Sequence, residues 1–587
     1  MYNIYLLLLI LVGFVYLPTI NGAFVHDTVI SPCSPYHTFL QPVDHFEDEK
    51  EYVNHYFYQR FCLNNKFVTP GHTPQTIFLI LGGENPLDPD LVNHLPFIDV
   101  ANETQAMVVA LEIRYYGESL PMPNLTTHHL RFLTTEQILE DIANFQIGLS
   151  NYLGLANSKW IVMGCSYGGT LATWYKMKYP NLATAVVASS APLKAVTKFD
   201  SYDRKIRENL GPECSASLKR LFDHIEHEIM TNKNTSLKSL FKCNQEMDDR
   251  MFLYMISETL SYAVQYNSKQ RAISNLCPKL EHDPELEIID LLSIYVGFVN
   301  DLFTNQHMEC EDYNIYNYAG AGPDVSGARQ WTWQMCSEYG WFFVGSDSNT
   351  TLKSSLINVT WWEEEVCRIL FGKPMSPFVD RINTRYSIDN IKQMSNILFT
   401  HGDFDPWMNL SVTDQCQLPS SNILIIPGES HCANWFSETA RDSVELKNSR
   451  KQLGSFIKQY VQTTCNNEFC RRDGGVCLPE KYNDTMFLTE CISANITCKD
   501  GIRTAIPIDE VLTSITGAHN ELPVDGAPPG VPGSVFIHHQ RRSKGVDPGS
   551  RPFIGHINQS DCSRTSPWTI STLSIIIPSV ILLVQLL

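Results

Sequence analysis

The pentapeptide Gly164-Cys165-Ser166-Tyr167-Gly168, which has the form G-x-S-x-G, constrains the fold of this chain more than any other stretch. The apolar run Trp160-Ile161-Val162-Met163 before it is typical of a strand, and residues 169–177 after it have a helical pattern that ends before Pro180. A serine between a strand and a helix sits on a sharp, strained turn where neighbouring backbones come close, which glycine tolerates best. The pattern therefore predicts a nucleophile elbow that exposes the hydroxyl of Ser166.

Strand-like and helix-like segments alternate on both sides of this elbow. Helical spacing of apolar residues extends from Thr135 to about Tyr152. Near-continuous apolar runs, which suit strands covered on both faces of a parallel sheet, occur at residues 75–81, 106–112, 185–188, 396–400 and 422–426. The alternation predicts an α/β fold, a doubly wound domain with a mainly parallel sheet.

The pattern changes between about Lys198 and Arg385, where the chain carries six cysteines and longer helical stretches such as Met251 to Tyr266. We expect this segment to be an inserted, mainly helical cap that interrupts the sheet. The predicted organisation is a signal peptide at 1–22, the first part of the α/β domain at 23–197, the cap at 198–385, the second part of the α/β domain at 386–463, a small cysteine-rich module at 464–500, a flexible linker at 501–560 and a hydrophobic tail at 561–587.

Each strand that follows the cap is succeeded by a residue that a serine nucleophile needs. Asp405 follows the first of them and His431 the second, 26 residues later. Serine, acid, histidine is the chain order of an α/β-hydrolase triad, and the carboxyl ends of parallel strands meet at one edge of the sheet. Asp403 is the alternative acid. We prefer Asp405, at the start of the turn made by Pro406, and expect Asp403 to cap that turn.

Other reactive residue types near these motifs have a plainer interpretation. His128, His129 and His401 are expected to be surface groups or to support the site from outside it. The 17 cysteines are an odd number, so at least one thiol stays free or pairs between chains. We expect Cys165 to be the free one, and we interpret it as buried and inert although it adjoins the nucleophile.

Features of exported proteins occur along the chain. The apolar run Leu7-Leu8-Leu9-Ile10-Leu11-Val12, followed by small residues at Gly22-Ala23, resembles a secretory signal peptide without a basic start, and an uncleaved anchor is the alternative. The cysteines lack zinc-like spacing and favour disulfides in an oxidising compartment. Nine N-x-S/T sequons predict glycosylation at Asn102, Asn124, Asn234, Asn349, Asn358, Asn409, Asn483, Asn495 and Asn558.

Several stretches from about Phe39 to Tyr460 carry a family resemblance. They are Phe39-Leu40-Gln41-Pro42-Val43-Asp44-His45-Phe46, Ile80-Leu81-Gly82-Gly83-Glu84, Arg114-Tyr115-Tyr116-Gly117-Glu118-Ser119, Arg131-Phe132-Leu133-Thr134 and Ala188-Ser189-Ser190-Ala191-Pro192. With them the chain resembles the prolyl carboxypeptidase family of serine exopeptidases, which includes dipeptidyl peptidase II. It is most similar to the thymus-specific serine protease branch, through Arg329-Gln330-Trp331, Cys336-Ser337-Glu338-Tyr339-Gly340, Asp405-Pro406-Trp407 and Ser430-His431-Cys432.

This resemblance implies an α/β-hydrolase fold with a helical, disulfide-linked cap, the SKS domain of the family. It carries a catalytic triad onto Ser166, Asp405 and His431, and it implies a cap disulfide between Cys336 and Cys367. The implied substrates are peptides, cleaved after a proline-like residue near one end.

The implied mechanism starts from a serine hydroxyl, which is a weak nucleophile until a neighbouring imidazole takes its proton. His431 is the expected base, and Asp405 orients and stabilises it. The backbone N–H groups of Tyr167 and Gly83 are the expected oxyanion donors. Trp407 either lines the substrate pocket or is a core aromatic under the cap. This chemistry requires no metal and no organic cofactor.

The net charge of −19 argues against a nucleic-acid partner. Two other classes of function stay open. A catalytically silent surface binding protein would keep the fold without the activity, and the intact triad argues against it. An esterase or lipase would use the same triad, and the peptidase-specific stretches argue against that. The sequence leaves open which end of a peptide is cleaved and whether the chain forms a homodimer.

The chain beyond the resemblance has features of its own. Five cysteines crowd into 34 residues, from Cys465 to Cys498, and predict a small disulfide module. The Pro- and Gly-rich stretch 527–534 indicates an extended linker. The apolar stretch from Trp568 follows small residues at Ser560-Asp561-Cys562-Ser563, which favours a removable glycosylphosphatidylinositol (GPI) signal over a membrane-spanning helix. We expect an extracellular or cell-surface protein, with the lysosome as the alternative.

Overall fold

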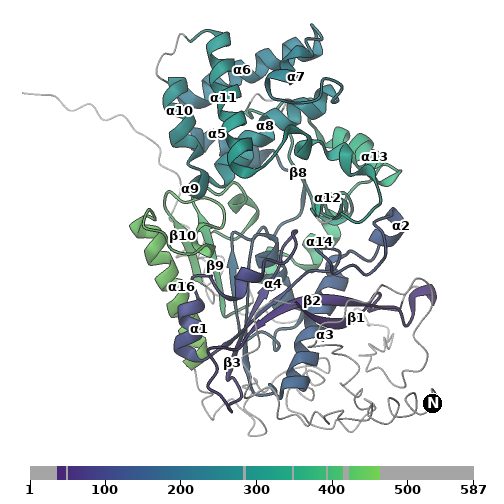
Figure 1. Ribbon diagram of the computed structural model, residues 1–587, viewed down its shortest axis with the longest axis vertical. Coiled ribbons are helices and arrows are strands. Elements are labelled where there is room, and N and C mark those ends of the chain that lie inside the picture. The colour runs from purple at the N-terminus through teal and green to yellow at the C-terminus, as the bar shows by residue number, and fades with distance from the viewer. Residues whose placement is uncertain are drawn as a thin grey trace, which may run out of the picture. The chain divides into compact units, whose positions relative to one another are not determined.

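The structure is a computed structural model that describes residues 36–47, 50–281, 286–324, 326–346, 350–391, 394–413 and 422–462. At its centre is an eight-stranded sheet with helices on both faces, and a group of further helices lies beyond one edge of that sheet (Figure 1). The predicted signal peptide, cysteine-rich module, linker and hydrophobic tail all lie outside the described residues.

The sheet is mainly parallel, as the sequence predicts. Its strands are β1 (His37–Pro42), β2 (Tyr56–Asn64), β3 (Thr76–Leu81), β4 (Met107–Leu111), β5 (Lys159–Cys165), β6 (Ala185–Ser189), β9 (Ile397–Gly402) and β10 (Asn422–Ile426). Their order is β1-β2-β4-β3-β5-β6-β9-β10, and only β1 with β2 and β2 with β4 pair antiparallel. The six strands from β3 to β6, β9 and β10 occupy the predicted segments.

The sequence does not predict β1 and β2, for a physical reason. In β1 the side chains of Phe39 and Gln41 are buried, whereas Leu40 and Pro42 are only half-buried. An antiparallel strand at the edge of a sheet needs core-facing residues at every second position only, so it shows no continuous apolar run.

Alternate side chains of the central strands enter two separate cores. In β3, Ile77, Leu79 and Leu81 belong to one core and Phe78 and Ile80 to the other. The first core is covered by α3 (Thr135–Leu153) and α4 (Tyr167–Lys178), and the second by α1 (Ile98–Thr104) and α16 (Val444–Gln462). Burial of both strand faces explains the continuous apolar runs of the sequence.

The helix predicted at 135–152 is confirmed as α3, and its ends show why it begins and stops there. The hydroxyl of Thr134 accepts a hydrogen bond from the N–H of Gln137 at 3.3 Å, which caps the first turn. Gly154 ends the helix with φ 67°, in the left-handed region that glycine adopts easily. Helix α3 therefore lies fixed against the sheet beside β1.

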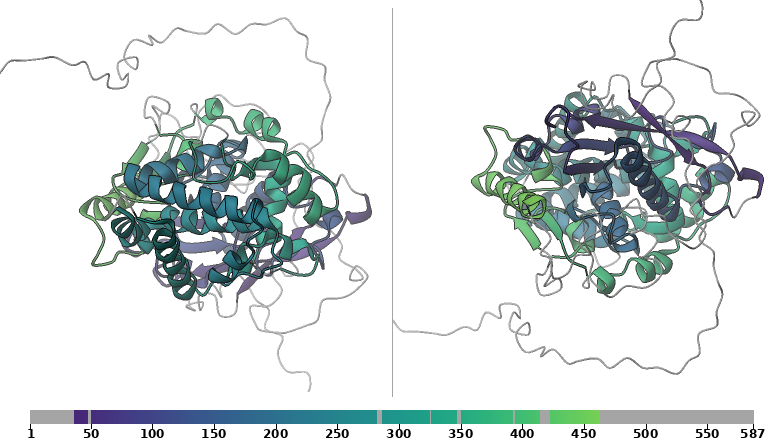
Figure 2. Two further views of the ribbon diagram at one scale, coloured as in Figure 1. Left: turned by 90° about the horizontal axis from the view of Figure 1, so that it is seen from above. Right: turned by 90° about the horizontal axis from the view of Figure 1, so that it is seen from below.

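A helical cap occupies the chain between β6 and β9. Its helices are α5 (Asp200–Leu210), α6 (Pro212–Met230), α7 (Ser236–Leu240), α8 (Asp249–Gln265), α9 (Asn267–Gln270), α10 (Ala272–Glu281), α11 (Ile288–Gln306), α12 (Ala328–Gln334), α13 (Cys367–Phe371), α14 (Val379–Arg385) and α15 (Ile388–Ile391). The view from above in Figure 2 shows the longer cap helices lying over the sheet. Outside the cap, the structure also describes the short helix α2 (Thr127–Leu130).

Disulfides and a short strand pair hold the cap together. The described part of the cap contains the disulfides Cys214–Cys277, Cys243–Cys310 and Cys336–Cys367. The last is the pair that the family resemblance implies. Strands β7 (Val196–Lys198) and β8 (Gly340–Phe342) pair in parallel and join the start of the insertion to its later half.

Among the described residues, α11 is long and apolar enough to cross a membrane by length and composition. It packs against α6 and α10, with Leu291, Tyr295 and Val299 buried in the cap. A core helix of a globular domain has the same composition, so this packing accounts for its apolar face.

The predicted glycosylation sites fall partly inside the described residues. Asn102, Asn358 and Asn409 are exposed, and Asn124 and Asn234 are half-buried. Asn349, Asn483, Asn495 and Asn558 lie outside the described ranges. Glycosylation itself stays a prediction.

Candidate active site

Ser166 lies on the turn between β5 and α4, where the elbow pattern predicts it. Its backbone has φ 54° and ψ −126°, outside the regions that non-glycine residues normally adopt. A Cβ at Gly164 would lie 2.2 Å from the carbonyl carbon of Gly168, and a Cβ at Gly168 would lie 2.6 Å from the carbonyl oxygen of Leu81. Both positions require glycine, and the tight turn holds Ser166 at the carboxyl edge of the sheet.

His431 and Asp405 form a buried pair. Nδ1 of His431 and Oδ1 of Asp405 are 2.9 Å apart, and the N–H of Trp407 donates to the same carboxylate oxygen at 2.9 Å. Burial by itself raises the pKa of Asp405, but the charge of His431 and these two hydrogen bonds lower it below its ordinary value. Asp405 is therefore held as a carboxylate against the imidazole.

The structure shows which of the two candidate aspartates contacts His431. Asp403 accepts a hydrogen bond from the N–H of Gly428 at 2.7 Å, so it links the turn after β9 to the turn after β10. Its side chain is half-buried, whereas Asp405 is fully buried against His431. The preferred acid is the one that contacts the histidine, and the other aspartate stabilises a turn.

Parallel strands account for this meeting of distant residues. Ser166 directly follows β5, Asp405 lies three residues after β9, and His431 lies five residues after β10. Strands β5, β6, β9 and β10 are consecutive neighbours and all run in parallel, so their carboxyl ends share one edge.

The loop that carries His431 is held from two sides. On the cap side, the carbonyl of Gln265 at the end of α8 accepts a hydrogen bond from the N–H of His431 at 3.0 Å. The hydroxyl of Ser268 in α9 accepts one from the preceding N–H of the loop at 2.7 Å. On the sheet side, the hydroxyl of Ser190 accepts one from the N–H of Cys432 at 2.8 Å. The position of the imidazole thus depends on both the sheet and the cap.

The prediction that Cys165 is a free thiol is wrong. Cys165 forms a disulfide with Cys432, the residue after His431, with 6.0 Å between the two Cα atoms. The cysteines are 267 residues apart in sequence, and they meet because each adjoins a residue that follows a parallel strand at the same sheet edge. Every cysteine in the described ranges is disulfide-bonded.

A cavity of about 190 Å³ lies between the elbow and the cap, and Ser166 forms part of its wall. The α/β domain also contributes Glu84, Tyr167, Pro192 and Trp407. The cap contributes Tyr202, Glu258, Tyr262, Gln265, Tyr313, Trp331 and Phe343. The wall is therefore mostly aromatic, and the cap supplies the larger share of it.

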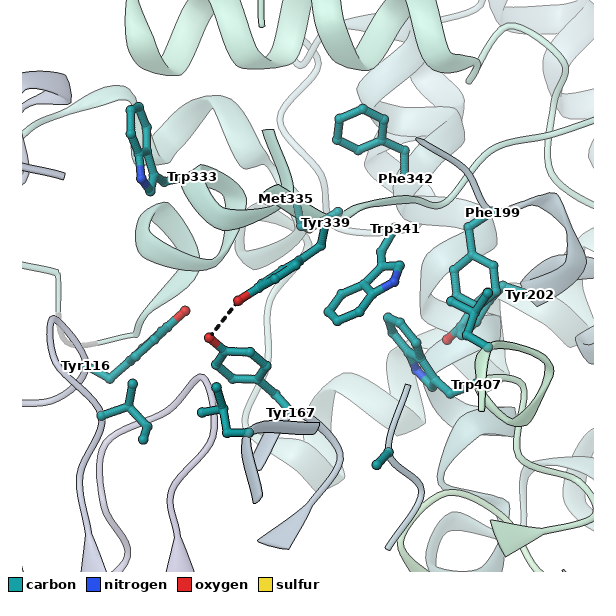
Figure 3. Close-up of a cluster of buried hydrophobic side chains, with 14 of the residues drawn as sticks. Tyr116, Tyr167, Phe199, Tyr202, Trp333, Met335, Tyr339, Trp341, Phe342 and Trp407 are labelled. Atoms are coloured by element: carbon teal, nitrogen blue, oxygen red, sulfur yellow. Dashed lines mark hydrogen bonds between the residues drawn. The ribbon is translucent and has the colours of Figure 1, made fainter. Parts of the chain in front are cut away.

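Trp407 fills both of the roles that the sequence leaves open. It lines the cavity, and its ring also packs in the core against Phe199 and Tyr202, with ring centroids 5.1 and 5.7 Å apart (Figure 3). Its Nε1–H donates to Oε1 of Gln265 at 2.8 Å. The indole is oriented by the cap while its backbone N–H binds the carboxylate of Asp405.

Tyr167, the residue after the nucleophile, is held by a buried polar network. Its hydroxyl lies 3.1 Å from the hydroxyl of Tyr339 (Figure 3). The same hydroxyl accepts a hydrogen bond from Nε2 of Gln334 at 2.7 Å. Oε1 of the same Gln334 accepts a hydrogen bond from the hydroxyl of Tyr116 at 2.6 Å. The network fixes the first turn of α4 beneath the cap.

The two segments expected to supply the oxyanion donors are in contact. Tyr167 is the first residue of α4, where backbone N–H groups have no partner within the helix, and Gly83 lies two residues beyond β3. Gly168 packs so closely on the carbonyls of Leu81 and Gly82 that a side chain there has no room. The loop that contains Gly83 therefore lies against the start of α4.

Two carboxyl groups, those of Glu84 and Glu258, line the cavity. Burial raises the pKa of Glu84, and the charge of His431 offsets this only in part. Burial also raises the pKa of Glu258, which forms an ion pair with Nζ of Lys353 at 2.6 Å. Among the described lining residues there is no lysine, arginine or histidine. A cationic group of a ligand would stabilise the ionised form of Glu84.

The remaining histidines differ from His431. Burial lowers the pKa of His401 in β9 to about 4, so this ring stays neutral beside the Asp405–His431 pair. His128 is exposed and His129 is half-buried. These placements agree with the supporting and surface roles expected of them.

Two groups of three side chains in the described ranges bring possible metal ligands together. They are Cys165, His431 and Cys432, and Cys214, Cys277 and Glu281. In both groups the two cysteines are bonded to each other, so neither group offers a thiolate ligand.

Sequence reasoning missed three features of the site. For the Cys165–Cys432 disulfide a signal existed, because each cysteine adjoins a predicted triad residue and triad residues converge in space. For Gln265 and Glu258 there was none, because both come from the cap and nothing in the local sequence of a helix tells which residues face a distant loop.

A mainly parallel α/β sheet with a strained serine between strand and helix, and with an Asp–His pair after two later strands, defines an α/β-hydrolase. Residues 41–453 match the family described as Serine carboxypeptidase S28. The chain belongs to this family of serine peptidases.

Several curated proteins are similar to this chain. A probable serine protease EDA2 of Arabidopsis thaliana is 31% identical over 64% of this chain and 75% of that protein. The thymus-specific serine protease of Mus musculus is 28% identical over 72% and 86%, and the lysosomal Pro-X carboxypeptidase of Bos taurus is 27% identical over 72% and 87%. Among solved structures, a proline iminopeptidase of Mycobacterium smegmatis is 14% identical, with a TM-score of 0.35 over 73% of this chain and 98% of that one.

Proposed function

We propose that this chain is a serine exopeptidase that cleaves peptides near one end through an acyl-enzyme formed on Ser166. One observation carries the proposal: the buried Asp405–His431 hydrogen bond of 2.9 Å lies at the sheet edge where the strained Ser166 lines a cap-covered cavity. A cavity enclosed by a cap admits a chain end more readily than the middle of a long chain, which favours exopeptidase activity.

In this mechanism the imidazole of His431 takes the proton of the Ser166 hydroxyl as its oxygen attacks the carbonyl carbon. The imidazolium then protonates the leaving amine, while Asp405 keeps the ring oriented and stabilises its charge. The N–H groups of Tyr167 and Gly83 stabilise the oxyanion. Water, activated by the same histidine, releases the acyl group.

Proline-directed specificity fits the chemistry of the cavity wall. The rings of Tyr202, Phe343 and Trp407, together with the ring of Pro192, offer an apolar surface on which a pyrrolidine ring packs well. Two related proteins carry the name Pro-X carboxypeptidase.

The charge of the cavity favours the amino end of a peptide. Glu84 and Glu258 line it, and the described lining contains no basic side chain. Glu258 is already paired with Lys353, so the carboxyl group of Glu84 is the one that would attract an α-ammonium group and repel an α-carboxylate. We therefore expect cleavage of a proline-containing dipeptide from the amino terminus to exceed removal of a residue from the carboxyl terminus.

The test is a substrate panel with the purified protein. It contains a fluorogenic proline-containing dipeptide, its N-acetylated form, a peptide with a penultimate proline at its carboxyl end, and a short-chain ester. We expect the free dipeptide substrate to be hydrolysed best, and N-acetylation to lower kcat/KM by roughly tenfold or more. Hydrolysis of the ester alone would favour an esterase, and inactivity of the folded protein on every substrate would favour a binding protein.

Variants of the triad complete this test. We expect Ser166→Ala to lower kcat by about 10⁴-fold or more without changing the thermal midpoint much, because only one polar atom is removed. Asp405→Asn should cost roughly 10³- to 10⁴-fold, since the asparagine no longer holds the reactive tautomer of His431. Asp403→Asn is the matched control with little expected loss. Near-normal activity of Ser166→Ala, or a larger loss from Asp403→Asn, would overturn the mechanism.

We further propose that the protein acts in the secretory pathway or at the cell surface. The disulfides of the described chain favour an oxidising compartment. Similar proteins are named as lysosomal and extracellular carboxypeptidases.

A further inference from the structure

A covalent bond joins the two loops that carry Ser166 and His431. The residue before the serine, Cys165, and the residue after the histidine, Cys432, form a disulfide. In the described part of the chain this is the one disulfide between the elbow and the histidine loop, and the other complete pairs lie within the cap.

The disulfide lies directly against the imidazole. A ring nitrogen of His431 and the Sγ atoms of Cys165 and Cys432 all lie within 4.8 Å of one another. Cys432 is buried and has φ 56°, so its backbone turns sharply just after the histidine. Movement of either sulfur would therefore shift the ring.

The other tethers of the histidine loop are hydrogen bonds, including three between Ser268 and Ser430. Gln265, Ser268 and Ser190 each accept one from the backbone of this loop. Each such bond contributes little net stability by itself, and those from Gln265 and Ser268 depend on the placement of the cap. The disulfide is the tether that links the histidine loop to the elbow itself.

We propose that the Cys165–Cys432 disulfide positions the imidazole of His431 relative to the hydroxyl of Ser166, and that opening it lowers turnover while the fold persists. The inference rests on the proposed triad. It makes Cys165 and Cys432 positioning residues, which touch no substrate and act through their neighbours. The rate of such a reaction depends steeply on the position of the catalytic group, because a displacement of about 1 Å lowers the rate on the order of 10²-fold.

Among the four disulfides for which the structure describes both cysteines, this bond is the most open to reagents. Cys165 is half-buried, whereas the six cysteines of the three cap disulfides are all buried. A thiolate of a small dithiol attacks one sulfur, forms a mixed disulfide and releases one cysteine thiolate. The second thiol of the reagent then releases the other cysteine, so that two electrons pass to the protein and the reagent leaves as a cyclic disulfide.

The first experiment compares two double variants, Cys165→Ala/Cys432→Ala and Cys214→Ala/Cys277→Ala. Both remove one disulfide, but the second removes it from the cap, between α6 and α10. At a temperature where both are folded by circular dichroism, we expect kcat of the first to fall roughly 10- to 100-fold with KM within about twofold of normal. The shape of its pH profile should also change. The cap variant should keep the kcat and pH profile of the unchanged enzyme.

Equal kcat values and equal pH profiles for the two double variants would overturn the proposal. A fluorophosphonate probe separates this failure from failure of the triad. Labelling of Ser166 in the unchanged enzyme supports the triad, and absence of labelling contradicts the proposed function itself. Labelling at the same rate in both double variants contradicts the positioning role alone.

A second measurement uses the unchanged chain, so it does not depend on whether a variant folds. The enzyme is exposed to low dithiothreitol, the new thiols are alkylated, and mass spectrometry identifies which disulfide has opened. We expect activity to fall in step with alkylation of Cys165 and Cys432 while the cap pairs stay oxidised, and to return on reoxidation before alkylation. Full activity after the Cys165–Cys432 bond has opened would overturn the proposal.

Discussion

Single side chains at the site are held in charge states that suit a hydrolase. Asp405 is kept ionised because the charge of His431 and two hydrogen bonds outweigh the effect of burial on its pKa. His401 is kept neutral because burial lowers its pKa to about 4. A neutral His401 leaves the Asp405–His431 pair without a competing positive charge next to it, which is where a catalytic imidazolium has to form.

Glu338 provides a pH-dependent test at this scale. Burial raises its pKa from 4.5 to about 7, although the N–H and hydroxyl of Thr135 both donate to its carboxylate at 2.9 Å. The folded state therefore retains a proton that the unfolded chain loses. Its contribution to the free energy of unfolding is fully present below pH about 4.5 and is lost as the pH rises through about 7.

We expect Glu338→Gln to remove this dependence, because glutamine resembles the protonated acid and still accepts from Thr135. At pH 8 the variant should be more stable than the unchanged chain by roughly 1–3 kcal/mol, and at pH 4 nearly equal to it. Thermal unfolding at the two pH values measures the difference. A variant that is less stable at pH 8 but equal at pH 4 would show that the carboxylate is needed in its ionised form.

At the scale of elements, the site depends on how tightly β5, the elbow and α4 pack. The glycines of the elbow are required by close backbone approach, and the cap reaches the histidine loop through the ends of α8 and α9. Because β5 and α4 pack this closely, the backbone of Ser166 is held at a positive φ. The strain at Ser166 is therefore imposed by its neighbours.

A pair of glycine substitutions tests this statement. Gly164→Ala would place a Cβ 2.2 Å from backbone of Gly168, and we expect it to destabilise the chain by more than ~3 kcal/mol. Gly297→Ala is the control in the exposed face of α11, where a Cβ meets nothing within 4 Å. There a gain of about 0.5–1 kcal/mol is expected from helix propensity. Similar thermal midpoints for the two variants would contradict the packing argument.

At the scale of the whole molecule, the α/β domain is assembled from two parts of the chain with the cap between them. The cap encloses the cavity and also orients Trp407 and the backbone of His431 through Gln265. A displacement of the end of α8 would therefore also move Trp407 and the backbone of His431.

The proposed cell-surface location is tested on the full chain. The tail at 561–587, which lies outside the described residues, has the composition of a GPI signal. We expect a phosphatidylinositol-specific phospholipase to release the peptidase activity from intact cells. A chain that ends at residue 560 should be secreted into the medium without phospholipase treatment. Activity that stays with the membrane until detergent is added would indicate a spanning helix.

Much of the site was predictable because its signals are local. The G-x-S-x-G pattern between a strand and a helix indicated Ser166, and continuous apolar runs indicated β9 and β10 ahead of Asp405 and His431. Hydrophobic periodicity and glycine requirements act between neighbours in sequence, so they can be read without coordinates. The edge strand β1 and its antiparallel neighbour β2 were not predicted, because strands with partly exposed side chains carry a weaker pattern.

Local patterns in the sequence therefore predict the α/β framework, the inserted cap and the candidates for the triad. The folded chain adds that Asp405 and not Asp403 contacts the histidine, that Cys165 pairs with Cys432, and that cap residues line the cavity. The reason is physical. These contacts join residues that are brought together by the parallel register of the sheet and by the packing of the cap, and over such separations nothing in the local sequence records which side chains will meet.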